Sequence, residues 1–171
     1  MKKYLQKALT PNEMIVREAK FSSVQFVPAI IVFIIGILIS ISTKEDVGYM
    51  ILGTIILTLI LCIPGAKTIL FNELAVTNKT VYGKKGIIKI SELQSPLRQI
   101  QNVKVEKNFW GRIFKYGIVE ITTTTGVYNY KYVKDPESFR NAVLSQIERT
   151  EEGKMDLHAQ KIADAISNNK N

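Results

Sequence analysis

A short stretch of cations and aromatic rings is the strongest candidate for binding chemistry in this sequence. Residues 107–117 read KNFWGRIFKYG, in which Lys107, Arg112 and Lys115 alternate with Phe109, Trp110, Phe114 and Tyr116. Tryptophan favours the boundary between lipid and water, and cations near a membrane are attracted by anionic headgroups. Aromatic rings next to cations also stack on single-stranded nucleic acid. The stretch therefore has the composition of a membrane, partner or nucleic-acid contact.

The same stretch also has a purely structural interpretation, because it connects two predicted strands. Phe114 and one other aromatic ring, for which Trp110 is the first candidate, would then fill the end of a hydrophobic core, while the two glycines form turns. This core interpretation is our first expectation. The alternative is that Trp110, Arg112 and Lys115 contact the membrane interface or a partner. The sequence argues against nucleic acid, since no recognised nucleic-acid fold accompanies the stretch.

A second basic site is predicted in YGKKG, residues 82–86, where Lys84 and Lys85 fall at the tip of an expected hairpin. A solvated turn is the first expectation there, because charge runs at turns commonly serve solubility. The alternative is a site for an anionic ligand, which Lys89 and Lys104 would extend if strand pairing brings them close.

The residue inventory gives no support for catalysis, a cofactor or a metal. The chain of 171 residues has one histidine, His158, and one cysteine, Cys62, which lies in an apolar run. The carboxylates Glu73, Glu92, Glu106 and Glu120 are scattered over separate predicted strands. There is no phosphate-binding glycine loop, metal-ligand cluster or serine elbow. We expect a protein that is not an enzyme, with no cofactor, metal or small-molecule substrate.

Two long apolar runs determine where these candidate sites would lie. Residues 21–43 and 47–66 contain no charged side chain, and about 20 apolar residues cross a bilayer as a helix. A cleaved signal peptide is a poor alternative for the first run, because the apolar core of a signal peptide is shorter and so is the polar segment that precedes it. Only TKED, residues 43–46, separates the runs, which predicts a transmembrane hairpin with a tight turn.

The distribution of Lys and Arg predicts the orientation of that hairpin. Five of these residues precede the first run, one (Lys44) lies in the turn, and 17 follow the second run against 11 acidic residues. Cations near the spans mark the cytoplasmic side. We therefore expect a multi-pass protein of the cytoplasmic membrane with both termini inside.

The rest of the chain divides into a leader, a β-rich part and a tail. LTPNEMIVREAKF, within and just after residues 1–20, predicts a short helix, and PGAK at 64–67 predicts the end of the second span. Alternating runs such as Val119, Ile121 and Thr123 predict six or seven short strands. Asp135 and Pro136 predict the start of an amphipathic helix of three to four turns that carries Phe139 and Val143. TEEGK predicts a break at the end of this helix. Residues 151–171 are expected to form a second, weaker helix or a disordered tail.

The order of these parts, together with three motifs, resembles a known family. NELAVTNKTVYGKKGIIKI, PLRQIQNVKVEKNFWGRIFKYGIVEITTTTG and DPESFRNAV are similar to the membrane-bound bacterial pleckstrin-homology (PH) family that includes the YdbS-like proteins. The resemblance covers roughly residues 13–148. Thr80 stands where the family often has a cation, and the tail lies outside the pattern.

The resemblance implies an α+β membrane protein: a two-helix transmembrane hairpin, then a PH-like antiparallel β-sandwich or barrel with a C-terminal capping helix. The expected divisions are a leader at 1–20, a hairpin at 21–66, a PH-like domain at 67–150 and a tail at 151–171. Eukaryotic PH domains hold phosphoinositide phosphates near hairpin tips such as the one at Lys84 and Lys85.

The function that follows is a non-enzymatic interaction or assembly module on the cytoplasmic face. Its expected partners are membrane lipid and either another membrane protein or a second copy of the chain. The alternatives are a domain that binds anionic lipid headgroups, or an accessory subunit of an envelope-stress or export system.

Overall fold

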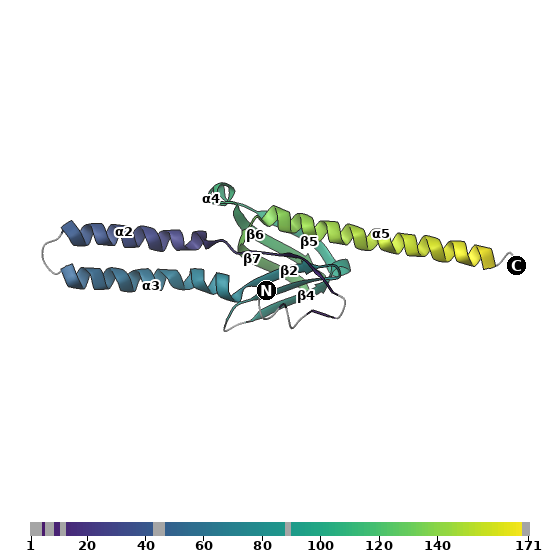
Figure 1. Cartoon of the computed structure of the whole chain (residues 1–171), viewed down its shortest axis with the longest axis horizontal. Coiled ribbons are helices and arrows are strands. Elements are labelled where there is room, and N and C mark those ends of the chain that lie inside the picture. Colours follow the sequence, from purple (N-terminus) through teal and green to yellow (C-terminus); the bar gives the residue numbers. More distant parts are fainter. Residues whose placement is uncertain (1–4, 6–8, 11–12, 43–46, 88–89, 169–171) are drawn as a thin grey trace.

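The computed structural model consists of an apolar helical hairpin, a two-sheet β-sandwich and one long C-terminal helix (Figure 1). It describes residues 5, 9–10, 13–42, 47–87 and 90–168, without the side chains of 163 and 165–168. The hairpin and the C-terminal helix leave the sandwich in opposite directions. The predicted turn at 43–46 and the cation Lys89 lie outside the described residues.

Two helices form the apolar hairpin. A short 3-10 helix, η1 (Ser23–Phe26), leads into α2 (Val27–Ser42), and α3 (Val47–Phe71) lies beside it. Ser23–Ser42 and Val47–Phe71 are both long enough and apolar enough to cross a membrane. Most of their large apolar side chains are exposed, because no other element of the chain covers them.

The α3 helix ends later than the sequence predicted. It runs through Pro64 and Gly65 to Phe71, and only then enters the sheet. Gly65 is buried against the ring of Phe26, and a Cβ atom at this position would lie 2.7 Å from the ring carbon Cε1. This packing supports the helix beyond the proline, where local sequence signals alone favour a stop. The base of the hairpin is thereby packed on the segment that precedes it.

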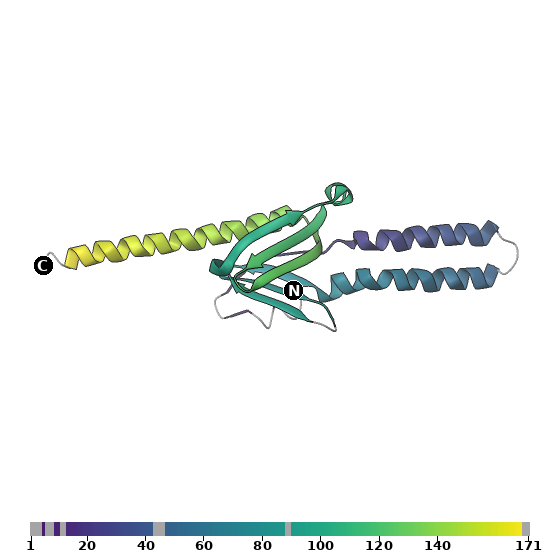
Figure 2. The same cartoon turned by 180° about the vertical axis from the view of Figure 1, so that it is seen from behind.

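The sandwich contains a four-stranded and a three-stranded antiparallel sheet (Figure 2). The first has the order β1 (Ile15–Glu18), β2 (Glu73–Thr77), β3 (Thr80–Lys85) and β4 (Ser91–Pro96). The second has the order β5 (Ile100–Glu106), β6 (Tyr116–Thr123) and β7 (Gly126–Lys134). A 3-10 turn, η2 (Leu97–Gln99), joins the two sheets, and a short helix, α4 (Phe109–Ile113), joins β5 to β6. The part after the hairpin holds six of these strands in the described residues, in agreement with the predicted six or seven, and the seventh, β1, lies in the leader.

The leader contributes a strand, so the helix predicted there is wrong. Residues 15–18 pair with β2, and the chain then continues along β7. There the amide of Ser22 donates to the carbonyl of Tyr132, and the amide of Lys134 donates to the carbonyl of Lys20. The strand is short and half exposed, and its partner β2 follows the whole hairpin. A local pattern could not reveal this pairing. The hairpin is therefore inserted between the first two strands of the sandwich.

The core lies between the two sheets and is closed by α5 (Pro136–Asn168). Phe139 and Val143 of α5 are buried against the sheets, as their helical spacing predicted. The predicted break at TEEGK is wrong, because α5 continues without interruption through Gly153. Glu, Lys, Gln and Ala, which favour helices, make up eight of the 19 residues from 150 to 168. The second half of α5 projects beyond the sandwich, and every described side chain from 151 onward is exposed.

Candidate functional site

The cation-aromatic stretch folds into an exposed helical turn, which we call the α4 loop (residues 107–117). The side chain of Asn108 accepts a 2.8 Å hydrogen bond from the amide of Gly111 and caps the short helix. Phe114 ends the helix, and its amide donates to the carbonyl of Trp110 at 2.9 Å. The turn is thus closed by its own local hydrogen bonds rather than by insertion into the core.

The large apolar side chains of the α4 loop point to solvent, so the core interpretation of Trp110 and Phe114 is wrong. Phe109 is 70% exposed, Trp110 58%, Ile113 54% and Phe114 49%. The rings pack on one another instead. The centroids of Phe109 and Trp110 lie 5.6 Å apart edge-to-face, and those of Trp110 and Phe114 lie 6.1 Å apart nearly parallel. The result is an exposed aromatic cluster on a loop of defined shape.

Lys115 follows the helix in a left-handed backbone conformation, with a φ of 53°. Glycine is the usual residue in that position, because a Cβ atom crowds the following carbonyl at a cost of roughly 1–2 kcal/mol. A lysine there keeps a cation beside the aromatic cluster despite this strain. Arg112 lies on the same turn and is also exposed.

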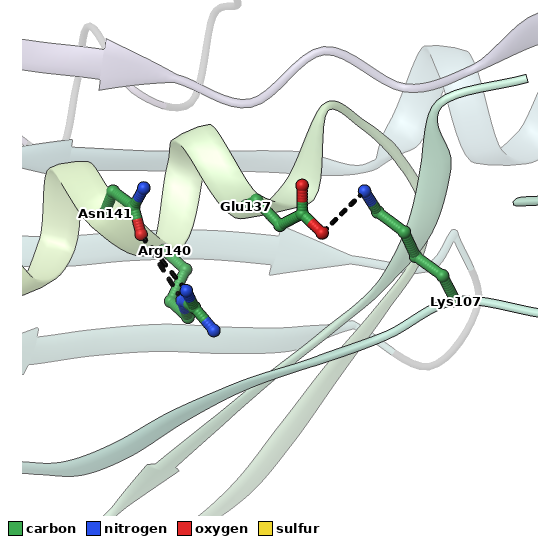
Figure 3. Close-up of polar contacts among 4 residues, drawn as sticks. All are labelled: Lys107, Glu137, Arg140 and Asn141. Carbon is green, nitrogen blue, oxygen red and sulfur yellow. Dashed lines mark hydrogen bonds and ion pairs between the residues drawn. The ribbon is translucent and has the colours of Figure 1, made fainter. Parts of the chain in front are cut away.

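The two ends of the α4 loop are fixed to the start of α5. Lys107 Nζ and Glu137 Oε1 form a 2.9 Å ion pair, drawn in Figure 3 with the neighbouring contact between Arg140 and Asn141. The hydrogen bond from Lys107, and then its charge, lowers the pKa of Glu137. The amide of Asp135 donates to the carbonyl of Lys115 at 2.8 Å. The loop is therefore held in place from both sides.

The α4 loop lies at the end of the sandwich from which the hairpin emerges. Both views place α4 on that side (Figures 1 and 2). Phe114 and Val27, the first residue of α2, line one shallow pocket, together with Lys20 and Lys134. The exposed aromatic cluster is thus adjacent to the point at which the chain enters the apolar hairpin.

The second predicted site, Lys84 and Lys85, lies at the same end but is bonded to neighbouring strands. Lys84 lies opposite Glu73 in the strand register, and Glu73 follows α3 almost directly. The Nζ atom of Lys84 lies 3.8 Å from Glu92 Oε1. Lys85 Nζ donates to the carbonyl of Asn129 at 3.1 Å. Lys104 belongs to the other sheet and pairs with Glu106 at 2.7 Å, so it does not extend this site.

Comparison with known proteins decides the family. The family model described as "Bacterial PH domain" matches residues 21–147, which is most of the chain. The chain belongs to the bacterial PH domain family. No curated protein and no solved structure gives a significant match. PH domains are in general non-catalytic modules that bind lipids or proteins, and the YdbS-like subfamily stays a prediction.

In this bacterial PH domain the connection between the first two strands is the apolar hairpin itself. The region matched by the family begins at residue 21, so β1 lies just before it. Of the two predicted contact sites, Lys84 at the end of β3 lies opposite Glu73, just after α3, and the α4 loop lies beside Val27 at the start of α2. Sequence reasoning found both sites but could not place them relative to the hairpin, because their positions depend on how the strands pair.

Sequence reasoning missed one buried polar cluster, centred on Glu13. The Glu13 carboxylate accepts hydrogen bonds from the hydroxyl and amide of Thr10, from Thr77 Oγ1 at 2.5 Å and from the Tyr82 phenol at 2.8 Å. Burial alone would raise the pKa of Glu13, but these hydrogen bonds outweigh it and lower the pKa to about 2. The cluster holds the leader on the outer face of the first sheet, beside Leu5 and Ala75. No sequence motif marks it.

The described residues contain no group of three His, Cys, Asp or Glu side chains that could hold a metal ion. Glu13 itself is surrounded by hydroxyl donors from Thr10, Thr77 and Tyr82. We therefore regard the two loops at the hairpin end as the candidate functional site of this bacterial PH domain.

Proposed function

We propose that this protein is a non-enzymatic bacterial PH module anchored in the cytoplasmic membrane by its hairpin, where it serves as an interaction and assembly platform. The observation that carries the proposal is the insertion of the hairpin between β1 and β2. An anchor inside the fold, packed at its base through Phe26 and Gly65, holds the sandwich directly against the membrane. A flexible linker would not do so.

The surface of the hairpin supports a lipid environment for it. Along α2 and α3 most of the exposed side chains are Ile, Leu, Val, Phe and Met, and Lys67 is the one exposed charge on the two helices. Soluble monomers rarely expose a continuous apolar patch of this extent. At 1.5 Å per residue, the 25 residues of α3 span about 37 Å, enough for a hydrocarbon core of about 30 Å.

The charge distribution supports an orientation with the sandwich in the cytoplasm. The part that follows α3 carries most of the Lys and Arg residues, whereas only Lys44 lies between the two helices. In this arrangement the two candidate loops face the inner leaflet, and α5 projects away from the membrane.

A platform of this kind has two kinds of protein partner, another membrane protein or a second copy of the chain. The hairpin would contact the partner within the lipid, and the sandwich and α5 would do so in the cytoplasm. Binding of anionic lipid headgroups is the alternative function, and service as an accessory subunit of an envelope-stress or export system is a special case of the platform.

Impermeant thiol labelling in cells tests the anchoring. In a Cys62→Ser background, a cysteine at position 44 is expected to react from outside, and a cysteine at the exposed position 152 only after the cells are opened. Labelling at 152 in intact cells would contradict the orientation. Release of the whole chain from membranes by alkaline carbonate would contradict the anchor itself.

Native mass spectrometry of the chain extracted in nanodiscs tests the platform. We expect a defined complex, either a homo-oligomer or a stoichiometric assembly with one membrane protein. A monomer that carries only anionic lipid would favour the headgroup-binding alternative instead.

A further inference from the structure

We propose that the α4 loop is an interfacial anchor: Phe109, Trp110 and Ile113 enter the headgroup layer of an anionic bilayer, beside the hairpin of the same chain. This inference rests on the proposed crossing of the membrane by the hairpin. It adds a second, independent attachment that fixes how the sandwich sits on the lipid surface.

Position is the first argument. Phe114 shares a pocket with Val27, where α2 begins, and Lys20 and Lys134 line the same pocket. If α2 enters the bilayer at that point, the α4 loop is at the level of the lipid headgroups without any rearrangement. The exposed aromatic cluster is then continuous with the apolar surface of the hairpin.

Shape and exposure are the second argument. Four large apolar side chains on one short turn are each about half exposed or more, and their rings support one another. The Asn108 cap and the Lys107–Glu137 ion pair hold this turn in place. Tryptophan and other amphipathic rings favour the layer between hydrocarbon and water, so the loop is already shaped for it.

Charge is the third argument, and it selects an anionic lipid surface as the occupant. The α4 loop contains three cations and no acidic residue. Within the described part of the chain, Lys107 is paired with Glu137, while no ion pair is found for Arg112 or Lys115. Lys115 keeps its cation at a backbone position that favours glycine. Each cation near an anionic leaflet strengthens surface binding by roughly fivefold.

The decisive measurement uses Trp110, which is the only tryptophan in the chain. The full-length protein is reconstituted in vesicles of phosphatidylcholine with phosphatidylglycerol, and its fluorescence is quenched by brominated lipids or by aqueous iodide. We expect strong quenching by lipids brominated near the headgroup, weaker quenching by deeply brominated lipids, and protection from iodide. Iodide access together with no quenching by any brominated lipid overturns the inference.

A charge-insertion variant adds a matched control. Phe109→Glu combined with Ile113→Glu replaces only exposed side chains, and severalfold weaker quenching by brominated lipid is expected. Leu157→Glu is the control: Leu157 is 51% exposed and lies on the part of α5 that projects beyond the sandwich, on the side opposite to the hairpin. Trp110 in the control is expected to be quenched by brominated lipid as strongly as in the parent. Equal quenching in all three proteins overturns the inference. The wild-type measurement decides the question even if the double variant does not fold.

The cations are tested separately with Arg112→Gln and Lys115→Gln. We expect the double variant to lose the stronger quenching that phosphatidylglycerol confers over pure phosphatidylcholine. An unchanged dependence on phosphatidylglycerol overturns the choice of an anionic surface. Alkaline carbonate extraction of the same vesicles distinguishes the two proposals. A chain that resists extraction but shows an iodide-accessible Trp110 refutes only the interfacial anchor, whereas an extracted chain refutes the membrane anchoring as well.

Discussion

The phenol of Tyr82 donates a 2.8 Å hydrogen bond to the carboxylate of Glu13, and so joins the segment before β1 to the middle of β3. Thr77 of β2 donates to the same carboxylate. One buried side chain therefore connects the leader with two strands that follow the hairpin. This cluster stabilises the attachment of β1, on which the closure of the sheet depends.

Replacement of Glu13 by Gln should destabilise the sandwich. The amide keeps one acceptor oxygen but presents an NH₂ group to hydroxyls that now donate, which leaves buried donors without good partners. A loss of about 1–3 kcal/mol is expected. Thermal unfolding of the full chain in detergent, followed by circular dichroism, measures it. Glu152→Gln, on the exposed part of α5, is the control and should leave the melting temperature unchanged.

The same carboxylate should produce an acid-dependent loss of stability. The pKa of Glu13 is lowered from 4.5 to about 2 in the folded protein. A lowered pKa means that the stabilisation is complete above pH 4.5 and disappears as the pH falls towards 2. Urea unfolding at several pH values in this window should show a steeper decline for the parent than for Glu13→Gln. Parallel pH profiles would show that Glu13 is not the group responsible.

Two glycines of the hairpin should differ sharply in their tolerance of a side chain. A Cβ atom at Gly36 would collide with the side chain of Thr54 on the facing helix, whereas nothing lies within 4 Å of one at Gly53. Gly36→Leu should therefore separate α2 from α3 and cost about 1–3 kcal/mol. Gly53→Leu should be neutral. Thermal stability of the full chain in detergent compares them, and equal melting temperatures would argue against the close packing of the two helices.

The fragment 67–150, which the sequence predicts as the domain, should not fold cooperatively by itself. It lacks β1, so the edge of β2 would be unpaired, and it also lacks Glu13 and the buried Ala19. Joining residues 13–22 to residue 72 through a short Gly-Ser linker, in place of the hairpin, should restore a β-rich spectrum and a cooperative melt. Cooperative melting of 67–150 alone would show that β1 is dispensable.

Sequence patterns predicted most of the sandwich because its strands and helix repeat their burial regularly. Val119 and Ile121 are buried at a period of two, and Phe139 and Val143 at helical spacing, as expected. The features of the sandwich that were missed, β1 first among them, depend on distant partners. β1 has only four residues, and its partner follows the hairpin, so its local pattern carries little information.

The candidate loop shows a different limit. Composition alone cannot distinguish a buried Trp110 from an exposed one, because aromatic residues are common in both places. The exposure of Trp110 is instead set by neighbouring backbone features. The cap at Asn108 closes the turn early, and the left-handed conformation of Lys115 returns the chain to β6. The contact role of Lys84, Lys85, Trp110, Arg112 and Lys115 therefore stays a prediction for the experiments above.

The position of β1 before the hairpin also sets the order in which the chain can be assembled. During synthesis, β1 leaves the ribosome first, but its partner β2 emerges only after both apolar helices. The four-stranded sheet cannot close until α2 and α3 lie side by side and bring their two ends together. Completion of the sandwich is thus conditional on formation of the hairpin. A chain whose hairpin fails to form is left with an unpaired strand edge, the kind of defect that cellular proteases and chaperones recognise.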